Sequence, residues 1–159
     1  MGVLTYGKDV TVQIQLNSYS NRDALLNALH FEYKSGSQCM ACAMRTARTT
    51  MFSNANGDRF GSPNVFILFV DGKSDNPEET WSEAQELRKA GVHVMVIALT
   101  HKYKYHEVEG IVSHPVSSTL FEVPSFDRLG RLADDMVGIL CNGELRNLYF
   151  MNFYAKGDD

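Results

Sequence analysis

The chain has 159 residues and a mass of 17.8 kDa, a size typical of one domain. Hydrophobic residues make up 44% and charged residues 21%, which excludes a disordered or collagen-like chain. The net charge of −4 disfavours a nucleic-acid-binding protein. No apolar run approaches the roughly 20 residues that span a bilayer, so no membrane span is expected, and residues 1–6 have no signal-peptide pattern.

The predicted elements begin with two short strands, at residues 1–6 and 10–16, which residues 7–9 join as an antiparallel hairpin. A short helix over residues 21–30 follows, capped by Ser20 or Asn21. A second helix is predicted from apolar residues at helical spacing, namely Met40, Ala43, Met44, Ala47 and Met51. Residues 54–63 are polar and contain glycine, which predicts a loop.

The clearest local signal is a βαβ unit over residues 65–99. Two unbroken apolar runs, 65–70 and 94–99, predict strands that are covered on both faces, as in parallel sheets. Between them, Asn76 and Pro77 mark the start of a helix and Gly91 marks its end. The predicted buried stripe of this helix is Trp81, Ala84, Leu87 and Ala90. The unit predicts one α/β domain with a mostly parallel sheet.

Three further elements are predicted in the last third of the chain. Residues 106–113 predict a weak helix, and residues 120–123 predict a short strand. Ser125 caps a final helix. The predicted buried stripe of this helix is Phe126, Leu129, Ala133, Met136 and Leu140.

Several segments occur in the order found in one known family. They are residues 3–7, 20–28, 69–75, 90–94, 114–116 and 126–136. This series resembles the von Willebrand factor type A (vWA) domain over about residues 1–141. The resemblance implies a three-layer, doubly wound, Rossmann-like α/β fold whose mostly parallel sheet has one antiparallel edge strand. It also implies a secreted or extracellular protein without enzyme activity, and a metal-ion-dependent adhesion site at the carboxyl ends of the strands.

The chain departs from the family pattern at the metal loops. The family's first strand, its Asp-x-Ser-x-Ser loop and its first helix precede the segments matched here, so residues 1–141 are interpreted as a vWA-like domain that is incomplete at the N-terminus. The threonine of the second metal loop aligns with Gln38, and the third-loop aspartate is present as Asp71. One carboxylate and one amide hold Mg²⁺ poorly, so we expect a degenerate site with no required cofactor. Asp71 is the residual metal ligand, for weak Mg²⁺ or Mn²⁺ binding at most.

The tail, residues 142–159, has two interpretations. In the family topology the first strand is central, and without it two inner edges of the sheet have no partner. Residues 147–154 follow the last helix and have the composition of a strand. The tail is therefore either a strand that completes the sheet, in this chain or in a partner, or the start of a second vWA copy. A truncated or mispredicted fragment stays an alternative.

The predicted ligand-binding surface is the carboxyl rim of the sheet. Its residues are Gln38, Asp71, Lys73, Tyr103 and Tyr105. Tyrosine-rich loops suit protein contacts because the ring gives a large apolar area and the hydroxyl a polar end. The alternative is a solvated loop in which Asp71 only stabilises a turn.

The three cysteines are too few, and their number is odd, for a disulfide scaffold. Cys39 and Cys42 have redox-motif spacing near a helix N-terminus, but no strand immediately precedes them as in a thioredoxin-like site. We expect buried or partly buried helix cysteines, with redox chemistry or zinc binding as minor alternatives. In the vWA pattern a cysteine often closes the domain at the position of Cys141, which is here either a free thiol or part of an interchain bridge.

These observations predict a non-enzymatic protein-binding module for adhesion or extracellular-matrix assembly. The expected partner is a matrix protein or another vWA chain, with oligomerisation through the open sheet or the tail. One alternative is a structural, self-associating fragment without a ligand. The other is an α/β enzyme that uses Asp71 or the Cys39/Cys42 pair, although no Ser-His-Asp order, Walker loop or nucleophile elbow is present in the sequence.

Overall fold

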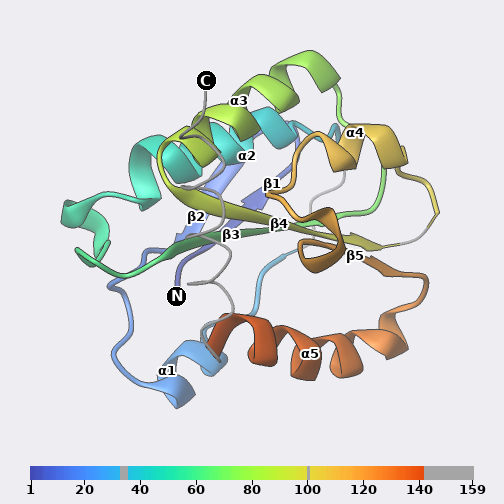
Figure 1. The fold of residues 1–159 in the computed structure, drawn as a ribbon. Helices are drawn as coiled ribbons and strands as arrows, with labels where there is room; N and C mark the ends of the chain where they lie inside the picture. Colours follow the sequence, from blue (N-terminus) through green and yellow to red (C-terminus); the bar gives the residue numbers. More distant parts are fainter. Residues whose placement is uncertain (33–35, 100, 142–159) are drawn as a thin grey trace, which may run out of the picture.

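The computed structural model describes residues 1–32, 36–99 and 101–141, which form two small β-sheets with helices on both sides (Figure 1). Strands β1 (Val3–Tyr6) and β2 (Val10–Ile14) pair antiparallel, as the sequence predicts. Strands β3 (Asn64–Val70), β4 (Val92–Leu99) and β5 (Leu120–Val123) form a parallel sheet in that order. The predicted α/β class, with an antiparallel strand beside a parallel sheet, is confirmed.

One side of the sheets is covered by α2 (Met40–Thr46), its π-helical continuation (Ala47–Met51), α3 (Pro77–Lys89) and α4 (Tyr105–Glu109). The predicted apolar stripe of the second helix is buried in full. Its members Met40, Ala43, Met44 and Ala47 pack into one cluster with residues of β3 and α3, namely Phe66, Leu68, Val70, Ala84 and Leu87. The alternation of β3 therefore directs every second side chain into this core.

The predicted stripe of α3 is wrong at two positions. Trp81 is 41% exposed and Ala90 is exposed, whereas Thr80 and Glu83 are buried. Glu83 tolerates burial because two arginines bind its carboxylate, Arg45 on α2 at 2.8 Å and Arg48 on the π-helical continuation at 2.9 Å. Hydrophobicity alone could not find this face, since two of its members are polar and are paired by residues from other parts of the chain.

The opposite side carries α1 (Arg22–Asn27) and α5 (Leu129–Cys141), which a 3₁₀ turn (Phe126–Arg128) precedes. Helix α1 is capped by the Asn21 side chain, which accepts from the backbone of Ala24 at 2.8 Å. The side chains of α5 that pack against β4 and β5 are Leu129, Leu132, Met136, Ile139 and Leu140. The predicted positions Leu129, Met136 and Leu140 are confirmed. Ala133 is exposed instead, because the helix begins at Leu129 and turns the larger Leu132 toward the sheet.

Short turns complete the described chain. The predicted loop at 54–63 contains a 3₁₀ turn (Asn54–Asn56), and a second one (Val116–Ser118) precedes β5. Helix α4 ends earlier than predicted because the backbone N–H of Ser113 bonds to Val94 of β4 at 2.8 Å. Gly91 adopts a φ of +80° at the end of α3, the left-handed stop predicted there. In the part of the chain that the structure describes, no helix is both long and apolar enough to cross a membrane.

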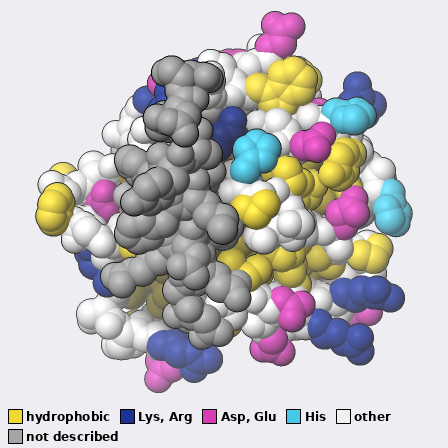
Figure 2. Space-filling model, in the orientation of Figure 1, with side chains coloured by type: hydrophobic (Ala, Val, Ile, Leu, Met, Phe, Trp, Pro, Cys, Tyr) yellow, Lys and Arg dark blue, Asp and Glu magenta, His cyan; other side chains and the backbone are white. Residues whose placement is uncertain are grey.

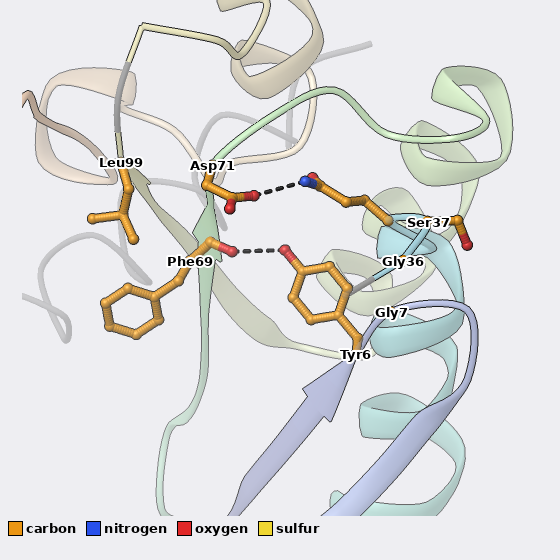
Figure 3. A pocket seen from close by; sticks show the side chains of 8 residues that line it. Tyr6, Gly7, Gly36, Ser37, Phe69, Asp71 and Leu99 are labelled. Atoms are coloured by element: carbon orange, nitrogen blue, oxygen red, sulfur yellow. Dashed lines mark hydrogen bonds between the residues drawn. The ribbon is translucent and has the colours of Figure 1, made fainter. Parts of the chain in front are cut away.

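Among the described residues, the two sheets do not join. Strands β1 and β3 are each the outer strand of their own sheet, and their facing edges are not paired with each other. The contact between them is made by a side chain: the Tyr6 hydroxyl donates to the carbonyl oxygen of Phe69 at 2.6 Å (Figure 3). Within the described part of the chain, the doubly wound architecture is therefore interrupted between β1 and β3.

Candidate functional site

The candidate site lies where β3 ends. Asp71 directly follows β3, and one of its carboxylate oxygens accepts a hydrogen bond from the side-chain amide of Gln38 at 2.7 Å. The two residues sit at the edge of a pocket of about 210 Å³ (Figure 3). The pocket is lined by Tyr6, Gly7, Gly36, Ser37, Gln38, Phe69, Asp71 and Leu99. The structure thus brings Gln38 and Asp71, which the sequence places on the predicted rim, into direct contact.

The backbone of Gln38 holds two loops together. Its N–H donates to the Asp75 carboxylate at 2.9 Å, and its carbonyl oxygen accepts from the Asp75 N–H at 3.2 Å. The neighbouring N–H of Cys39 donates to the carbonyl oxygen of Gly7 at 3.2 Å. The end of β1, the start of α2 and the loop after β3 therefore meet at one short segment.

Gly72 permits the contact between Gln38 and Asp71. A Cβ atom at position 72 would lie 2.9 Å from the amide nitrogen of Gln38, closer than real Cβ contacts. A side chain at this position would therefore push the amide away from Asp71. The sequence Asp71-Gly72 allows the carboxylate and the approaching amide to share one narrow space.

Tyr6 forms the wall of the pocket on the β1 side. Burial, together with the negative charge of Asp71, holds the pKa of the Tyr6 hydroxyl well above its ordinary value. The hydroxyl is therefore protonated at physiological pH and keeps donating to Phe69. Phe69 itself is 49% exposed, so the pocket combines an apolar side with the polar Gln38–Asp71 pair.

A buried carboxylate, which the sequence analysis missed, supports the loop after β3. Glu107 on α4 is 4% exposed and accepts from the N–H of Ser74 at 2.9 Å. The Ser74 hydroxyl shares a hydrogen bond with Thr80 at 2.6 Å, and the Trp81 indole donates to the backbone of Glu107 at 2.8 Å. No local sequence signal identifies Glu107, because its partners come from positions more than twenty residues away.

The other predicted rim residues differ in their surroundings. Lys73 is exposed in the loop after Asp71, and Tyr105 is 47% exposed at the start of α4. Tyr103 is partly buried and packs against the core cluster of α2, β3 and α3, which leaves less of its ring for a ligand. Cys141 is the last residue of α5, and its side chain lies outside the described part, so its thiol chemistry stays a prediction.

Cys39 and Cys42 are partly buried at the start of α2, where the sequence predicts them, and a disulfide joins them. The sequence predicts buried or partly buried helix cysteines and leaves their oxidation state open, and the structure supplies the bond. Its origin is local: Cys39 is the N-cap of α2, and its Cα lies 5.2 Å from that of Cys42. One turn of helix is enough to bring two sulfurs at this spacing together.

The described residues fit a divalent cation poorly. Among them, no group of three or more His, Cys, Asp or Glu side chains could hold a metal ion. The amide of Gln38 points an N–H donor at Asp71, where a cation would need an oxygen ligand. The amide oxygen of Gln38 is buried and has no hydrogen-bond partner among the described residues.

Comparison with known proteins identifies the family. The model of the von Willebrand factor type A domain matches residues 1–135. Cuticlin-6 of Caenorhabditis elegans is 30% identical over 148 residues, which cover 92% of this chain and 25% of that protein. Vitrin of Mus musculus is 30% identical over 152 residues, 89% of this chain and 23% of vitrin. Integrin and collagen chains match as well.

Solved structures agree with this assignment. Proximal thread matrix protein 1 from the mussel byssus, solved with a zinc-occupied MIDAS motif, has a TM-score of 0.77 and 25% identity to this chain. The match covers 88% of this chain and 34% of that one. The chain thus spans about a quarter of the two curated relatives and a third of the structural one. It belongs to the von Willebrand factor type A domain family.

Proposed function

We propose that this chain is an extracellular, non-enzymatic vWA module that binds a protein partner through the carboxyl rim, in adhesion or matrix assembly. Support for the general role comes from relatives in matrix and adhesion proteins. The main observation in favour of the rim as the binding surface is the pocket at the ends of β1 and β3, which has the Gln38–Asp71 pair at its edge.

The chemistry of the rim suits a protein surface. Phe69 offers half of its ring, while Gln38 and Asp71 offer a polar edge to the same pocket. Lys73 is exposed in the loop after Asp71, and Tyr105 is exposed at the start of α4. A pocket with one apolar side and a few fixed polar groups recognises side chains that have an apolar body and a polar end. Figure 2 shows acidic and basic side chains interspersed on the face drawn, in keeping with a protein partner rather than a polyanion.

The proposed binding does not depend on a tightly held metal ion. In this chain the Gln38 amide satisfies an oxygen of Asp71 directly, and Asp75 accepts from the Gln38 backbone. A divalent ion would have to displace the amide and would gain few oxygen ligands in return. The chain differs in this respect from the zinc-occupied relative.

Three features argue against the enzyme alternative. The Cys39 and Cys42 sulfurs are bonded to each other, so neither is a thiolate nucleophile while this bond is intact. Burial lowers the pKa of His93, which lies inside β4 and away from the rim pocket. In the Gln38–Asp71 pair an amide donates to a carboxylate. An amide is not a nucleophile that a neighbouring carboxylate could activate as a base, so the pair does not form a catalytic nucleophile–base unit.

The test is binding of the intact chain to purified matrix proteins, measured by biolayer interferometry. Lys73→Glu and Tyr105→Ala change the rim, whereas Lys89→Glu and Tyr19→Ala are matched controls at residues of similar exposure. Lys89 ends α3 and Tyr19 follows β2, so both lie toward the opposite end of the strands. We expect at least a tenfold loss of affinity from each rim variant and less than a twofold change from each control.

The same assay tests the role of metal. Binding should persist in excess EDTA, since no ion is needed to complete the rim. Equal losses from rim and control variants would refute the rim as the binding surface. Loss of binding in EDTA that Mg²⁺ restores would refute metal-independent recognition while leaving the surface assignment intact.

A further inference from the structure

Among the described residues, the facing edges of β1 and β3 are not hydrogen-bonded to each other as neighbouring strands. Paired strands lie about 4.8 Å apart and exchange hydrogen bonds directly between their backbones. Here the two strands belong to different sheets, and the tyrosine side chain of residue 6 reaches from β1 to the backbone of β3. Figure 3 shows the two strands pointing the same way on either side of this bridge. The rim pocket lies at the carboxyl end of the space between them.

Strand β3 is covered unequally on its two faces. Phe66, Leu68 and Val70 point toward α2 and α3 and are at most 8% exposed. Val65 and Ile67, on the α5 side, are only partly buried, and Phe69 is 49% exposed. An apolar strand whose outer edge has no strand partner among the described residues, and whose second face is incompletely covered, fits the addition of another apolar strand.

The path of the chain leads toward this space. Helix α5 follows β5 and runs back under the sheet, toward the side on which α1, β1 and β2 lie (Figure 1). A strand that follows α5 would therefore run parallel to β3. The connection from β3 to β4 crosses the opposite face in the opposite direction, so a return beneath the sheet keeps the right-handed crossover that parallel strands require.

Residues 147–154, which lie outside the described residues, have the length and composition for this position. At roughly 3.3 Å per residue they reach about 26 Å, slightly more than β3. Residues 142–146 provide a linker of the usual length for an αβ connection. The segment carries no charge, and six of its eight side chains are large and apolar or aromatic: Leu148, Tyr149, Phe150, Met151, Phe153 and Tyr154.

We propose that residues 147–154 insert between β1 and β3 of the same chain as a parallel strand, which joins the two sheets into one. The strand bonds to the outer edges of both neighbours, and its apolar side chains complete the cover on the α5 side. A backbone N–H of the new strand then replaces the Tyr6 hydroxyl as the hydrogen-bond donor to the Phe69 carbonyl oxygen. This inference concerns how the fold is completed. Because the rim pocket lies at the carboxyl end of the same space, the inserted strand would also border that pocket, whereas hydrogen exchange tests the insertion without any binding partner.

Amide hydrogen exchange of the full chain, followed by mass spectrometry, tests the insertion. Amides of residues 148–153 should exchange about a hundredfold more slowly than those of residues 156–159, because a central strand protects them. Phe150→Pro should remove this protection, since proline cannot donate to a central strand. Phe150→Leu, which keeps the N–H, and Ala155→Pro, which lies beyond the segment, are the controls and should retain it.

Sedimentation at several protein concentrations identifies the source of the strand. A monomer with a protected tail supports insertion within one chain. Protection that appears only in a concentration-dependent dimer would assign the strand to a second copy and overturn the proposal. Unprotected residues 148–153 in the unmodified chain, or protection that survives Phe150→Pro, would overturn it as well. If Phe150→Pro fails to fold while both controls fold, the segment is part of the core, as proposed.

Discussion

Three leucine-to-alanine substitutions measure how well the two sides of the sheet are packed. Leu87 on α3 is fully buried in the cluster with α2 and β3, Leu129 on α5 is partly buried, and Leu26 on α1 is 44% exposed. Removing a buried leucine side chain forfeits its transfer free energy and leaves a cavity, together about 2–5 kcal/mol. We expect Leu87→Ala to lie in this range, which is a large share of the roughly 5–15 kcal/mol of a whole domain.

The expected order follows from exposure. Leu129→Ala should destabilise by about 1–2 kcal/mol, because part of its side chain is already in water. Leu26→Ala, the matched surface control, should change the free energy of unfolding by less than about 0.5 kcal/mol. Urea denaturation followed by circular dichroism gives all three free energies of unfolding. These can be compared directly if the m-value is the same in each variant. A loss below about 0.5 kcal/mol for Leu87→Ala would refute the assignment of the core to the α2–α3 side.

Three further predictions concern charge, the rim and metal. Burial acts to raise the pKa of Glu83, but hydrogen bonds from Arg48 and Arg45 outweigh it and hold the pKa below the ordinary value of 4.5. The stabilisation from Glu83 is therefore present above that pH and lost as the pH falls through the lowered pKa, so urea midpoints should decline less steeply with acid in Glu83→Gln. Gly72→Ala should displace the Gln38 amide, weaken rim binding and destabilise by about 0.5–1.5 kcal/mol. Gly130→Ala, in open space on helix α5, is the control and should be neutral or stabilising. Equal losses of rim binding and of stability in Gly72→Ala and Gly130→Ala would contradict the role assigned to Gly72. Millimolar Mg²⁺ or Mn²⁺ should leave the melting temperature unchanged, whereas an ion at 100 times its dissociation constant would add about 2.7 kcal/mol. A rise of several degrees that Asp71→Ala abolishes would establish a metal site.

The elements that could be predicted are those with a local signal. The unbroken apolar runs of β3 and β4 and the Asn76–Pro77 start of α3 depend on neighbouring residues only, and they form as expected. The same holds for the hairpin of β1 and β2. Residue periodicity also located the buried side of α2, because all of its members are apolar.

The remainder depends on contacts between distant residues. Glu83 is buried only because Arg45 on α2 and Arg48 on its π-helical continuation bind it there. Glu107 is buried because it accepts a hydrogen bond from the backbone of Ser74. At the rim, the family alignment put Gln38 and Asp71 on facing loops. The hydrogen bond between them, and the narrow space that Gly72 leaves for the amide, depend on how the two loops pack and could not be predicted from the sequence.

The meeting point of three chain segments at Gln38 has a consequence for recognition. The Gln38 backbone is tied to Asp75 from both sides, its side chain is tied to Asp71, and the next residue is tied to Gly7. A surface fixed in this way surrenders little conformational entropy when a partner docks. Its affinity then derives from pre-organisation, and association should proceed as a rigid-body encounter without a slow rearrangement step.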